Sequence, residues 1–437
     1  MKKKLEMVKS VILSLLIITS LLLTLAIWNY QPNIDEADNQ LTDAKLNGKE
    51  ETKKNLIQPS QIIFHNNDFY QGLANKNKQK ELYTNIQEWS FYDFDTVPAE
   101  SLDSVLNQTQ NKIEIIFPTP LPFTIIRDLF TVNEEGNLPE SLFDRMYILL
   151  DEVLTSKQVQ FVNNSTGSAV TANIQNIAEV RDYMERIKAN NELNEYITYT
   201  ANNESTIYLP TKVNMYQRPV QVNLTSPNLL RSVLFNNPST VRNSKNITGE
   251  DVYTDGFRTM VVYPYHIEYT NPTSVENNMI NAKQLINQTF QFIHSHQGWT
   301  TDGNNTYQLY DLDRDSSTVQ YRLTYDGFPV FVNNEYSTIT VTMGEDKVPY
   351  HYNRPLIQLK SSFTGQKVDD LHSAEEIIAH INQENSYPAD MIENIAIGYK
   401  ITEQQGYIFE LTPAWFIKSY LGWRELVFKD PLSEGGG

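Results

Sequence analysis

The segment 275–294 reads VENNMINAKQLINQTFQFIH, and together with the four short runs that follow it this segment decides the fold class. Its apolar residues recur at helical spacing, and they are Met279, Leu285, Ile286, Phe290 and Ile293. The runs at 307–312, 319–325, 328–332 and 339–343 are rich in β-branched and aromatic residues. Asp302-Gly303 and Asp326-Gly327 predict turns between them. We therefore expect a helix packed beside an antiparallel meander.

A second helix followed by strands closes the chain. It begins at Ser373-Ala374-Glu375-Glu376, which resembles a capping box without its ideal spacing, and runs to about residue 382. We expect this helix to bury one apolar face, made of Leu371, Ala374, Ile377, Ile378 and Ile381. Strands are expected at 392–401, 406–413 and 415–427. The two copies share no strict sequence period, so the repetition is architectural and predicts an α+β class.

The region before these copies predicts a first α+β domain. KIEIIF at 112–117 alternates like a strand, and we expect Pro118, Pro120 and Pro122 to end it, because proline lacks a backbone donor. Helices are expected at 142–154 and 174–187. The resulting domains are 59–190, a middle α+β domain at 191–355, and a C-terminal α+β domain at 356–437.

Charge is distributed unevenly along the chain. The 437 residues carry 35 basic and 53 acidic side chains, a net charge of −18. Residues 1–30 hold four lysines against Glu6, a net charge of +3, which leaves −21 for the rest. Within the first of these parts, residues 10–30 contain no charged side chain and are long enough for one membrane-spanning helix. The threonines and serines in this segment can return hydrogen bonds to the helix backbone.

The lysines before this segment predict its orientation. Positive flanks stay inside, so we expect a cytoplasmic stub at 1–9, a transmembrane helix at 10–30 and about 400 residues outside the cell membrane. Residues 31–58 are polar and charged, which predicts a tether. A cleaved signal peptide is the alternative, but its apolar region is usually shorter, about 7 to 15 residues. A cysteine-free acidic domain outside fits a Gram-positive cell surface.

Composition excludes several classes of site. The chain has no cysteine, which rules out disulfides, thiolate zinc sites, iron–sulfur clusters, a cysteine nucleophile and a lipid-modified cysteine anchor. Nucleic-acid binding needs a basic surface, and this chain is acidic. No G-x-S-x-G, H-E-x-x-H or P-loop pattern occurs. We therefore expect no catalytic residues, no cofactor and no enzymatic activity.

Two groups of histidines could in principle bind a metal. His372, Glu376 and His380 share a helix face through their four-residue spacing. That face is opposite the apolar one, so we expect it to point to solvent instead. His294 and His296 end the other helix, where positive charge would complement the carbonyl dipole.

Asp311, Asp313 and Asp315 imitate the start of a calcium-binding loop. Ser316 occupies the position that requires glycine, and Arg322 occupies the position of the bidentate glutamate. We expect the aspartates to serve a β-turn in a polar loop, and we expect no metal site.

Ser20 and Thr24 form a candidate contact face on the apolar helix. Both are small and lie four residues apart, so another helix could approach closely there. Ordinary tolerance of hydroxyl side chains in a single span is an equally good interpretation.

Four stretches carry a resemblance to a known family. They are IWNYQP at 27–32, LFNNPSTVR at 234–242, YTDGFRTM at 253–260 and LTPAW at 411–415. With the anchor and the matching length, the chain resembles the YycH family, membrane-anchored accessory proteins of the YycFG (WalRK) two-component system of low-GC Gram-positive bacteria. The resemblance implies three extracellular domains, the last two YycI-like or PepSY-like, each with a helix on an antiparallel meander.

The resemblance also implies a function. It predicts a non-enzymatic regulator of the essential sensor histidine kinase WalK (YycG), acting with a YycI-like membrane protein through transmembrane-helix and extracellular contacts to control cell-wall signalling. It leaves open whether the effect is activation or inhibition. An anchored protein that binds or modifies peptidoglycan is an alternative, motivated by the 25 Tyr, 19 Phe and 5 Trp. A protease-inhibiting or chaperone-like domain pair rests on fold analogy alone.

Overall fold

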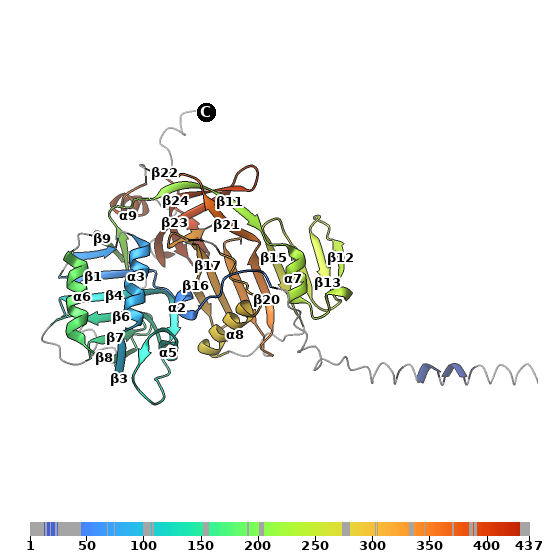
Figure 1. The fold of residues 1–437 in the computed structure, drawn as a ribbon, viewed down its shortest axis with the longest axis horizontal. Helices are drawn as coiled ribbons and strands as arrows, with labels where there is room; N and C mark the ends of the chain where they lie inside the picture. Colours follow the sequence, from blue (N-terminus) through green and yellow to red (C-terminus); the bar gives the residue numbers. More distant parts are fainter. Residues whose placement is uncertain are drawn as a thin grey trace, which may run out of the picture.

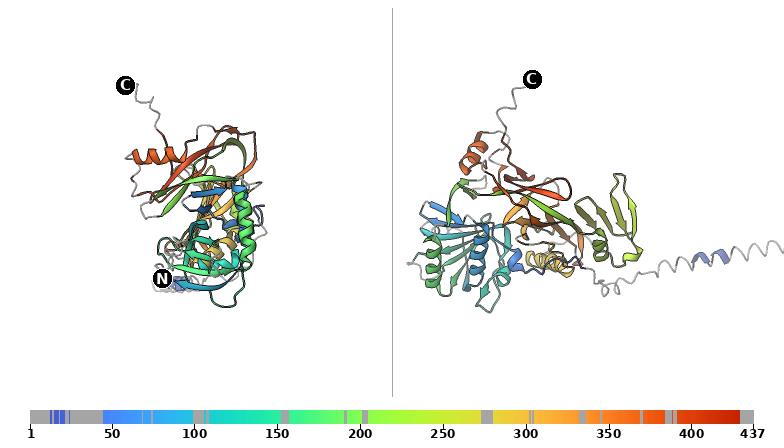
Figure 2. Two further views of the ribbon diagram at one scale, coloured as in Figure 1. Left: turned by 90° about the vertical axis from the view of Figure 1, so that its left-hand side faces the viewer. Right: turned by 45° about the horizontal axis from the view of Figure 1, so that its top comes forward.

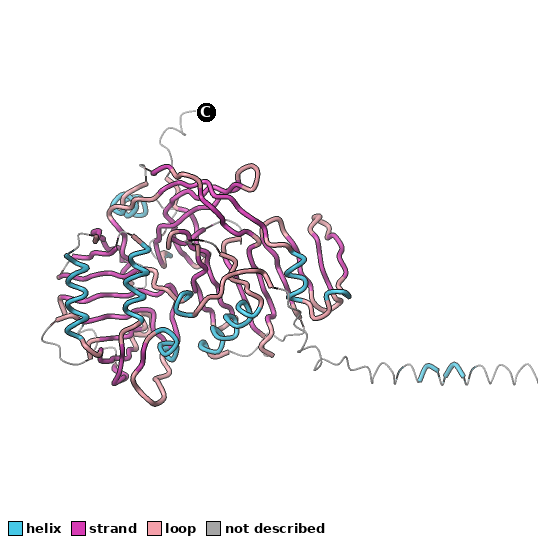
Figure 3. The backbone as a smooth tube through the Cα atoms, viewed as in Figure 1, coloured by secondary structure: helices cyan, strands magenta, loops and turns pink. Residues whose placement is uncertain are grey.

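The computed structural model describes residues 45–428 with short gaps, together with eight residues of the apolar N-terminal segment. The gaps are 68, 74, 99–105, 107–108, 152–156, 190–191, 201–204, 273–279, 302, 304, 332–335, 345, 369–370, 384–387 and 389–390. The described part consists of two large sheets with few helices, so the predicted α+β class is confirmed (Figures 1 and 3).

The first sheet has ten strands in the order β10-β9-β2-β1-β4-β6-β7-β8-β3-β5. Helices α3 (Lys76–Gln87) and α6 (Ile177–Ala189) lie side by side across it (Figure 1). The strands are β1 (Gln61–Asn66), β2 (Phe69–Leu73), β3 (Ser90–Val97), β4 (Asn111–Pro122), β5 (Thr131–Val132), β6 (Leu142–Leu149), β7 (Val159–Val162), β8 (Ala169–Ile174), β9 (Leu193–Thr200) and β10 (Thr206–Pro210).

Two expectations about this sheet are wrong. The stretch expected as a helix at 142–154 forms strand β6, which pairs with β4 on one side and β7 on the other. Phe143, Met146 and Leu149 recur every three residues, which also fits one face of a helix, so periodicity alone did not identify the strand. The prolines do not end β4, which continues to Pro122; its pairing with β6 is only interrupted between Ile116 and Leu121.

The second sheet joins the middle and C-terminal parts of the chain. Its path is β12-β13-β14-β15-β20-β19-β17-β18-β23-β24-β11-β21, and β16, β22 and β25 pair with β17, β11 and β24. The strands are β11 (Tyr216–Leu224), β12 (Arg242–Lys245), β13 (Asp251–Thr254), β14 (Thr259–Val262), β15 (His266–Thr270), β16 (Thr306–Asp313), β17 (Thr318–Tyr325), β18 (Phe328–Phe331), β19 (Thr338–Met343), β20 (Pro349–Pro355), β21 (Ile357–Ser362), β22 (Gln366–Lys367), β23 (Asn394–Glu403), β24 (Ile408–Ser419) and β25 (Gly422–Glu425).

Each expected helix packs against its expected strands. Helix α8 (Ala282–Ser295) lies over β17 and β19, while residues 275–279 of the expected helix fall outside the described part. Helix α9 (Ala374–Gln383) packs with β23 and β24 through a shared apolar cluster. The two meanders form one sheet, because β18 pairs in parallel with β23. The shorter helices are α2 (Lys53–Leu56), α5 (Ile126–Leu129), α7 (Pro227–Leu234), η2 (Phe123–Ile125) and η3 (Pro238–Thr240).

The start of α9 corrects a detail of the sequence analysis. The Ser373 hydroxyl accepts from the Glu376 amide at 3.3 Å, and the Glu376 carboxylate accepts from the Ser373 amide at 2.8 Å. This is a complete reciprocal capping box, and its three-residue spacing is the ideal one.

Residues 45–58, which we call the strap, belong to the expected tether but are bound to the folded part of the chain. The Leu46 and Gly48 amides donate to the carbonyls of His296 and Gln297 at 2.9 and 3.0 Å. Leu46 and Leu56 are buried in the core, and α2 within the strap packs beside α5 and β16. Buried leucines and paired amides fix the strap to both sheets despite its polar composition.

One hydrophobic cluster extends through both sheets, and it includes Phe161 of the first and Trp299 beside the second. A second cluster joins β9 and β10 to α9, β23 and β24. In Figure 2 the C-terminal part, orange to red, lies against the first sheet in both views. The first sheet thus extends to Pro210, past the expected boundary at 191, and the three-domain division stays a prediction.

Candidate functional site

The histidine face on α9 is covered by an aromatic ring. Phe428 stacks on both histidine rings. Its ring centroid lies 3.7 Å from that of His372 and 4.1 Å from that of His380. His372 Nδ1 lies 3.3 Å from the Glu376 carboxylate. The expected solvent-facing surface is therefore partly covered by the end of the described chain. Among the described residues, no group of three or more histidine, aspartate or glutamate side chains is placed to hold a metal ion.

His296 does not carry the positive charge that we expected at the end of α8. It is 4% exposed, and burial, with the nearby Arg354 cation, lowers its pKa to about 3. Its Nε2 lies 3.4 Å from the Tyr352 hydroxyl. A neutral imidazole cannot complement the helix dipole by charge, so the expected electrostatic role of His296 is wrong. His294 lies in the last helical turn, as expected.

The aspartate loop forms the expected turn. The Asp313 carboxylate accepts from the Asp315 amide at 2.9 Å and from the Ser316 hydroxyl at 2.6 Å. These bonds lower the pKa of Asp313 by stabilising its charged form. The carboxylate thus serves the β16–β17 connection.

The candidate helix-contact residues fall in the N-terminal segment. The Thr24 hydroxyl donates to the Ser20 carbonyl at 2.9 Å, and the Thr19 hydroxyl donates to the Leu15 carbonyl at 2.7 Å. This confirms that hydroxyls return hydrogen bonds to the backbone there. Within the part of the chain that the structure describes, no helix is both long and apolar enough to cross a bilayer. The contact role of Ser20 and Thr24 stays a prediction.

A buried polar network is centred on Glu114 of β4, and no sequence pattern predicted it. Its carboxylate accepts from Arg145 at 2.5 Å, Tyr208 at 2.8 Å and Tyr147 at 3.1 Å, and lies 2.9 Å from His65 Nε2. Burial alone would raise the pKa of Glu114, but Arg145 and the other donors outweigh it and lower the pKa to about 2.

This arrangement favours a structural role for Glu114. A carboxylate with four partners has no lone pair directed to a substrate and stays ionised, so it is poorly suited to proton transfer near neutral pH. Arg145 also donates to the Thr206 carbonyl of β10, at the far edge of the sheet order. The network therefore joins β4 and β6 to the edge strand β10 of the first sheet. Only the alternation of Ile and Glu in KIEIIF hinted at a charge inside the sheet.

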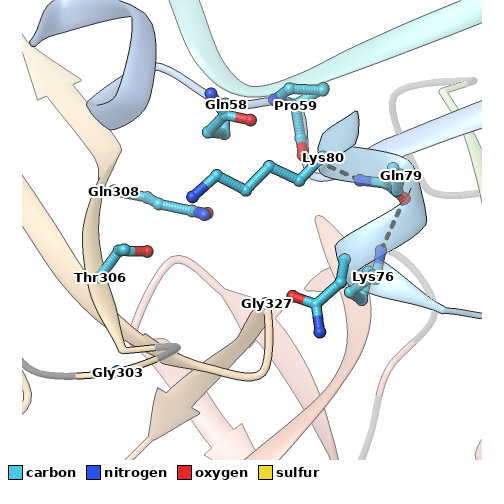
Figure 4. Close-up of a pocket in the computed structure, with 10 residues that line it drawn as sticks. Gln58, Pro59, Lys76, Gln79, Lys80, Gly303, Thr306, Gln308 and Gly327 are labelled. Atoms are coloured by element: carbon cyan, nitrogen blue, oxygen red, sulfur yellow. Dashed lines mark hydrogen bonds between the residues drawn. The ribbon is translucent and has the colours of Figure 1, made fainter. Parts of the chain in front are cut away.

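A polar cavity lies where the strap and the two sheets meet, and we call it the junction cavity. Its volume is about 110 Å³, and it is lined by Gln58, Pro59, Lys76, Asn77, Gln79, Lys80, Gly303, Thr306, Gln308 and Gly327. Figure 4 shows Lys80 extending from α3 across the cavity toward Gln308 on β16. The sequence analysis did not anticipate this cavity, because its residues come from three distant segments.

The Lys76 ammonium is held beside the junction cavity by neutral groups. It donates to the Ser60 carbonyl at 2.8 Å and to the Gln79 side-chain oxygen at 3.0 Å. Although the side chain keeps some exposure, the surrounding protein atoms lower its pKa to about 8 by desolvation. Gly327 is required opposite it, because its φ is +79° and an added Cβ would lie 2.6 Å from the Lys76 Cβ.

Two of the four family-like stretches meet at one end of the second sheet. Arg258 donates to the Asn236 side chain at 2.7 Å, and Asp255 accepts from the Phe257 and Arg258 amides at 3.0 and 2.8 Å. The turn between β13 and β14 is thereby rigid, and it presents Phe257 with 68% of its surface exposed. An exposed aromatic ring on a fixed turn is a candidate protein-contact residue.

Known proteins and families match almost the whole chain. The family model for the YycH protein N-terminal domain matches residues 6–192, and that for the YycH protein C-terminal domain matches 204–431. The two-component system WalR/WalK regulatory protein YycH of Bacillus subtilis (strain 168) is 21% identical over 440 residues, covering 95% of each chain.

A solved structure shows the same fold. The crystal structure of YycH from Bacillus subtilis matches with a TM-score of 0.72 at 17% identity, covering 87% of this chain and 98% of that one.

Proposed function

This chain belongs to the YycH family, and on that premise we propose that it is a non-enzymatic regulator of a WalR/WalK two-component system. The observation that carries the proposal is the end-to-end match to both family models and to a relative named as a regulatory protein of that system. The saturated hydrogen bonding of Glu114 supports a non-enzymatic role for the buried charges.

The finer part of the proposal concerns how the regulator acts. It would span the cell membrane once through residues 10–30, with the bulk of the chain outside, and contact the sensor kinase WalK together with a YycI-like partner. The charge-free segment, the +3 stub before it and the small residues Ser20 and Thr24 support this arrangement. The exposed Phe257 supports an additional contact outside the membrane.

Co-purification from membranes tests this mechanism. We expect Ser20→Leu with Thr24→Leu to reduce recovery of the kinase and the YycI-like protein at least several-fold, because bulky residues keep the helices apart. Ser14→Leu is the matched control, since Ser14 lies about 120° around the helix from Ser20. Full association of a protein whose anchor is replaced by an unrelated helix would refute the helix contact. Loss of kinase recovery even with the wild-type chain would refute the regulatory function itself.

A further inference from the structure

The junction cavity contains positive charge without a matching acid. Two lysines line it, and its other lining side chains are amides, a hydroxyl, a proline ring and glycines. Lys76 has neutral acceptors only, and among the described residues no ion pair or hydrogen bond involves the Lys80 ammonium. Glu81 follows Lys80 on α3 but does not line the cavity. The chain as a whole has a net charge of −18, whereas this cavity is lined by two lysines and by no acidic side chain.

The uncharged groups around the cavity are also suited to an anion. Gln58, Gln308 and Asn77 carry amide N–H donors, and Thr306 carries a hydroxyl. Figure 4 shows Gln308 and Thr306 on the side of the cavity opposite α3, so donors are available from both walls. A partly desolvated ammonium is stabilised by an anionic partner, because Coulomb attraction strengthens as water is excluded.

The size of the cavity limits what it can hold. One water molecule needs roughly 10–15 Å³ of this kind of cavity volume, so about 110 Å³ accommodates a group of several heavy atoms. Phosphate and carboxylate groups have this size, and they accept several hydrogen bonds from lysine and amide donors at once.

We propose that the junction cavity binds a small oxyanion, a phosphate or a carboxylate group, between Lys80 and Lys76 of α3 and Gln308 of β16. The bound group touches three segments: the end of the strap at Gln58, the first turns of α3, and the strand β16 of the second sheet. Its binding therefore stabilises the junction of the two sheets and the chain that leads to the N-terminal segment. This inference does not depend on the proposed regulatory function.

Calorimetric titration of the full-length protein in detergent micelles tests the proposal. Sodium phosphate is added at pH 7 with ionic strength held constant by sodium chloride, and sodium acetate is titrated in a parallel arm. We expect saturable binding in at least one arm, and the arm that binds identifies whether phosphate or carboxylate is preferred. We also expect slower hydrogen exchange at 76–80 and 305–308 on binding, because the oxyanion joins these segments.

Substitutions locate the site. Lys80→Gln is expected to weaken binding at least tenfold, and Lys80→Arg to restore most of it. Gln308→Ala, on the opposite wall, is expected to weaken binding several-fold. Lys212→Gln removes an exposed lysine elsewhere and should leave binding unchanged. The proposal is overturned if neither anion binds saturably, or if Lys80→Gln and Lys212→Gln bind the anion equally well.

Discussion

At the residue scale, the protein handles two buried titratable side chains in opposite ways. Glu114 remains charged because Arg145 and three further partners surround it, and its pKa falls to about 2. His296 remains neutral because it is buried beside another cation, Arg354, and its pKa falls to about 3. The difference follows from the neighbours, since both groups are almost inaccessible to water.

The His296 pKa predicts a pH dependence of stability. The unfolded chain takes up a proton near pH 6.5, whereas the folded protein does so only near pH 3, so acidification favours unfolding. Well above pH 6.5, His296 therefore does not change the free energy of unfolding. As the pH falls from 6.5 to 3, His296 lowers this free energy by about 1.4 kcal/mol per pH unit. We expect the free energy of unfolding, measured with urea, to fall between pH 6.5 and pH 5 by about 2 kcal/mol less in His296→Gln than in wild type.

Ser295→Ala is the control for this measurement, because Ser295 is the neighbouring residue in α8, is exposed and has no titratable side chain. That variant should keep the wild-type pH dependence. Equal pH dependence in His296→Gln and wild type would show that the pKa of His296 is the same in the folded and unfolded protein.

At the scale of elements, the strap depends on one glycine. A Cβ at Gly48 would lie 2.3 Å from the Gln297 carbonyl oxygen and 2.6 Å from the Trp299 carbonyl. We expect Gly48→Val to detach the strap, because backbone atoms cannot move away cheaply. Hydrogen exchange of 45–58 should then accelerate at least tenfold, while the strands of both sheets keep their protection.

Glu50→Val provides the comparison, since it places the same side chain at an exposed position of the strap. It should leave exchange of the strap unchanged. Retained protection in Gly48→Val would mean that the strap can shift without losing its hydrogen bonds.

The elements differ in how far sequence could predict them. Helix α9 was predictable because its apolar face and its Ser373–Glu376 cap are local features. Strand β6 was not, because Phe143, Met146 and Leu149 recur at a spacing that also fits a helix, and its pairing with β4 and β7 depends on residues outside the segment. The capture of the strap was missed because its polar composition hides Leu46 and Leu56, whose burial depends on distant partners.

At the scale of the whole molecule, the shared core predicts cooperative unfolding. One hydrophobic cluster contains residues of both sheets, and a second joins β9 and β10 to the C-terminal strands. Separate unfolding would expose these contacts, so we expect one transition in urea. Hydrogen exchange at increasing urea should give the same midpoint for β4 of the first sheet and β17 of the second. Two separated midpoints would instead establish independently folding units.

A candidate site could be predicted from the sequence where its residues are neighbours along the chain, and not where they come from distant segments. The turn at Asp313 was predicted correctly because its partners lie within three residues. The Glu114 network joins residues as far apart as His65 and Tyr208, and the junction cavity joins residues as far apart as Gln58 and Gly327, so no spacing rule could reveal them. The sequence also predicted the position of His296 but not its charge, which depends on its burial and then on the nearby Arg354 of β20.

The amino-acid sequence by itself determined the α+β class, the helices α8 and α9, the asymmetry of charge and the family, because these rest on local pattern and on order along the chain. Only the tertiary structure decided that the two meanders share one sheet, that the strap is fastened to it, and that Lys76 and Lys80 border an acid-free cavity. The physical reason is that strand pairing, burial and the field around a charge depend on residues brought together from distant parts of the chain.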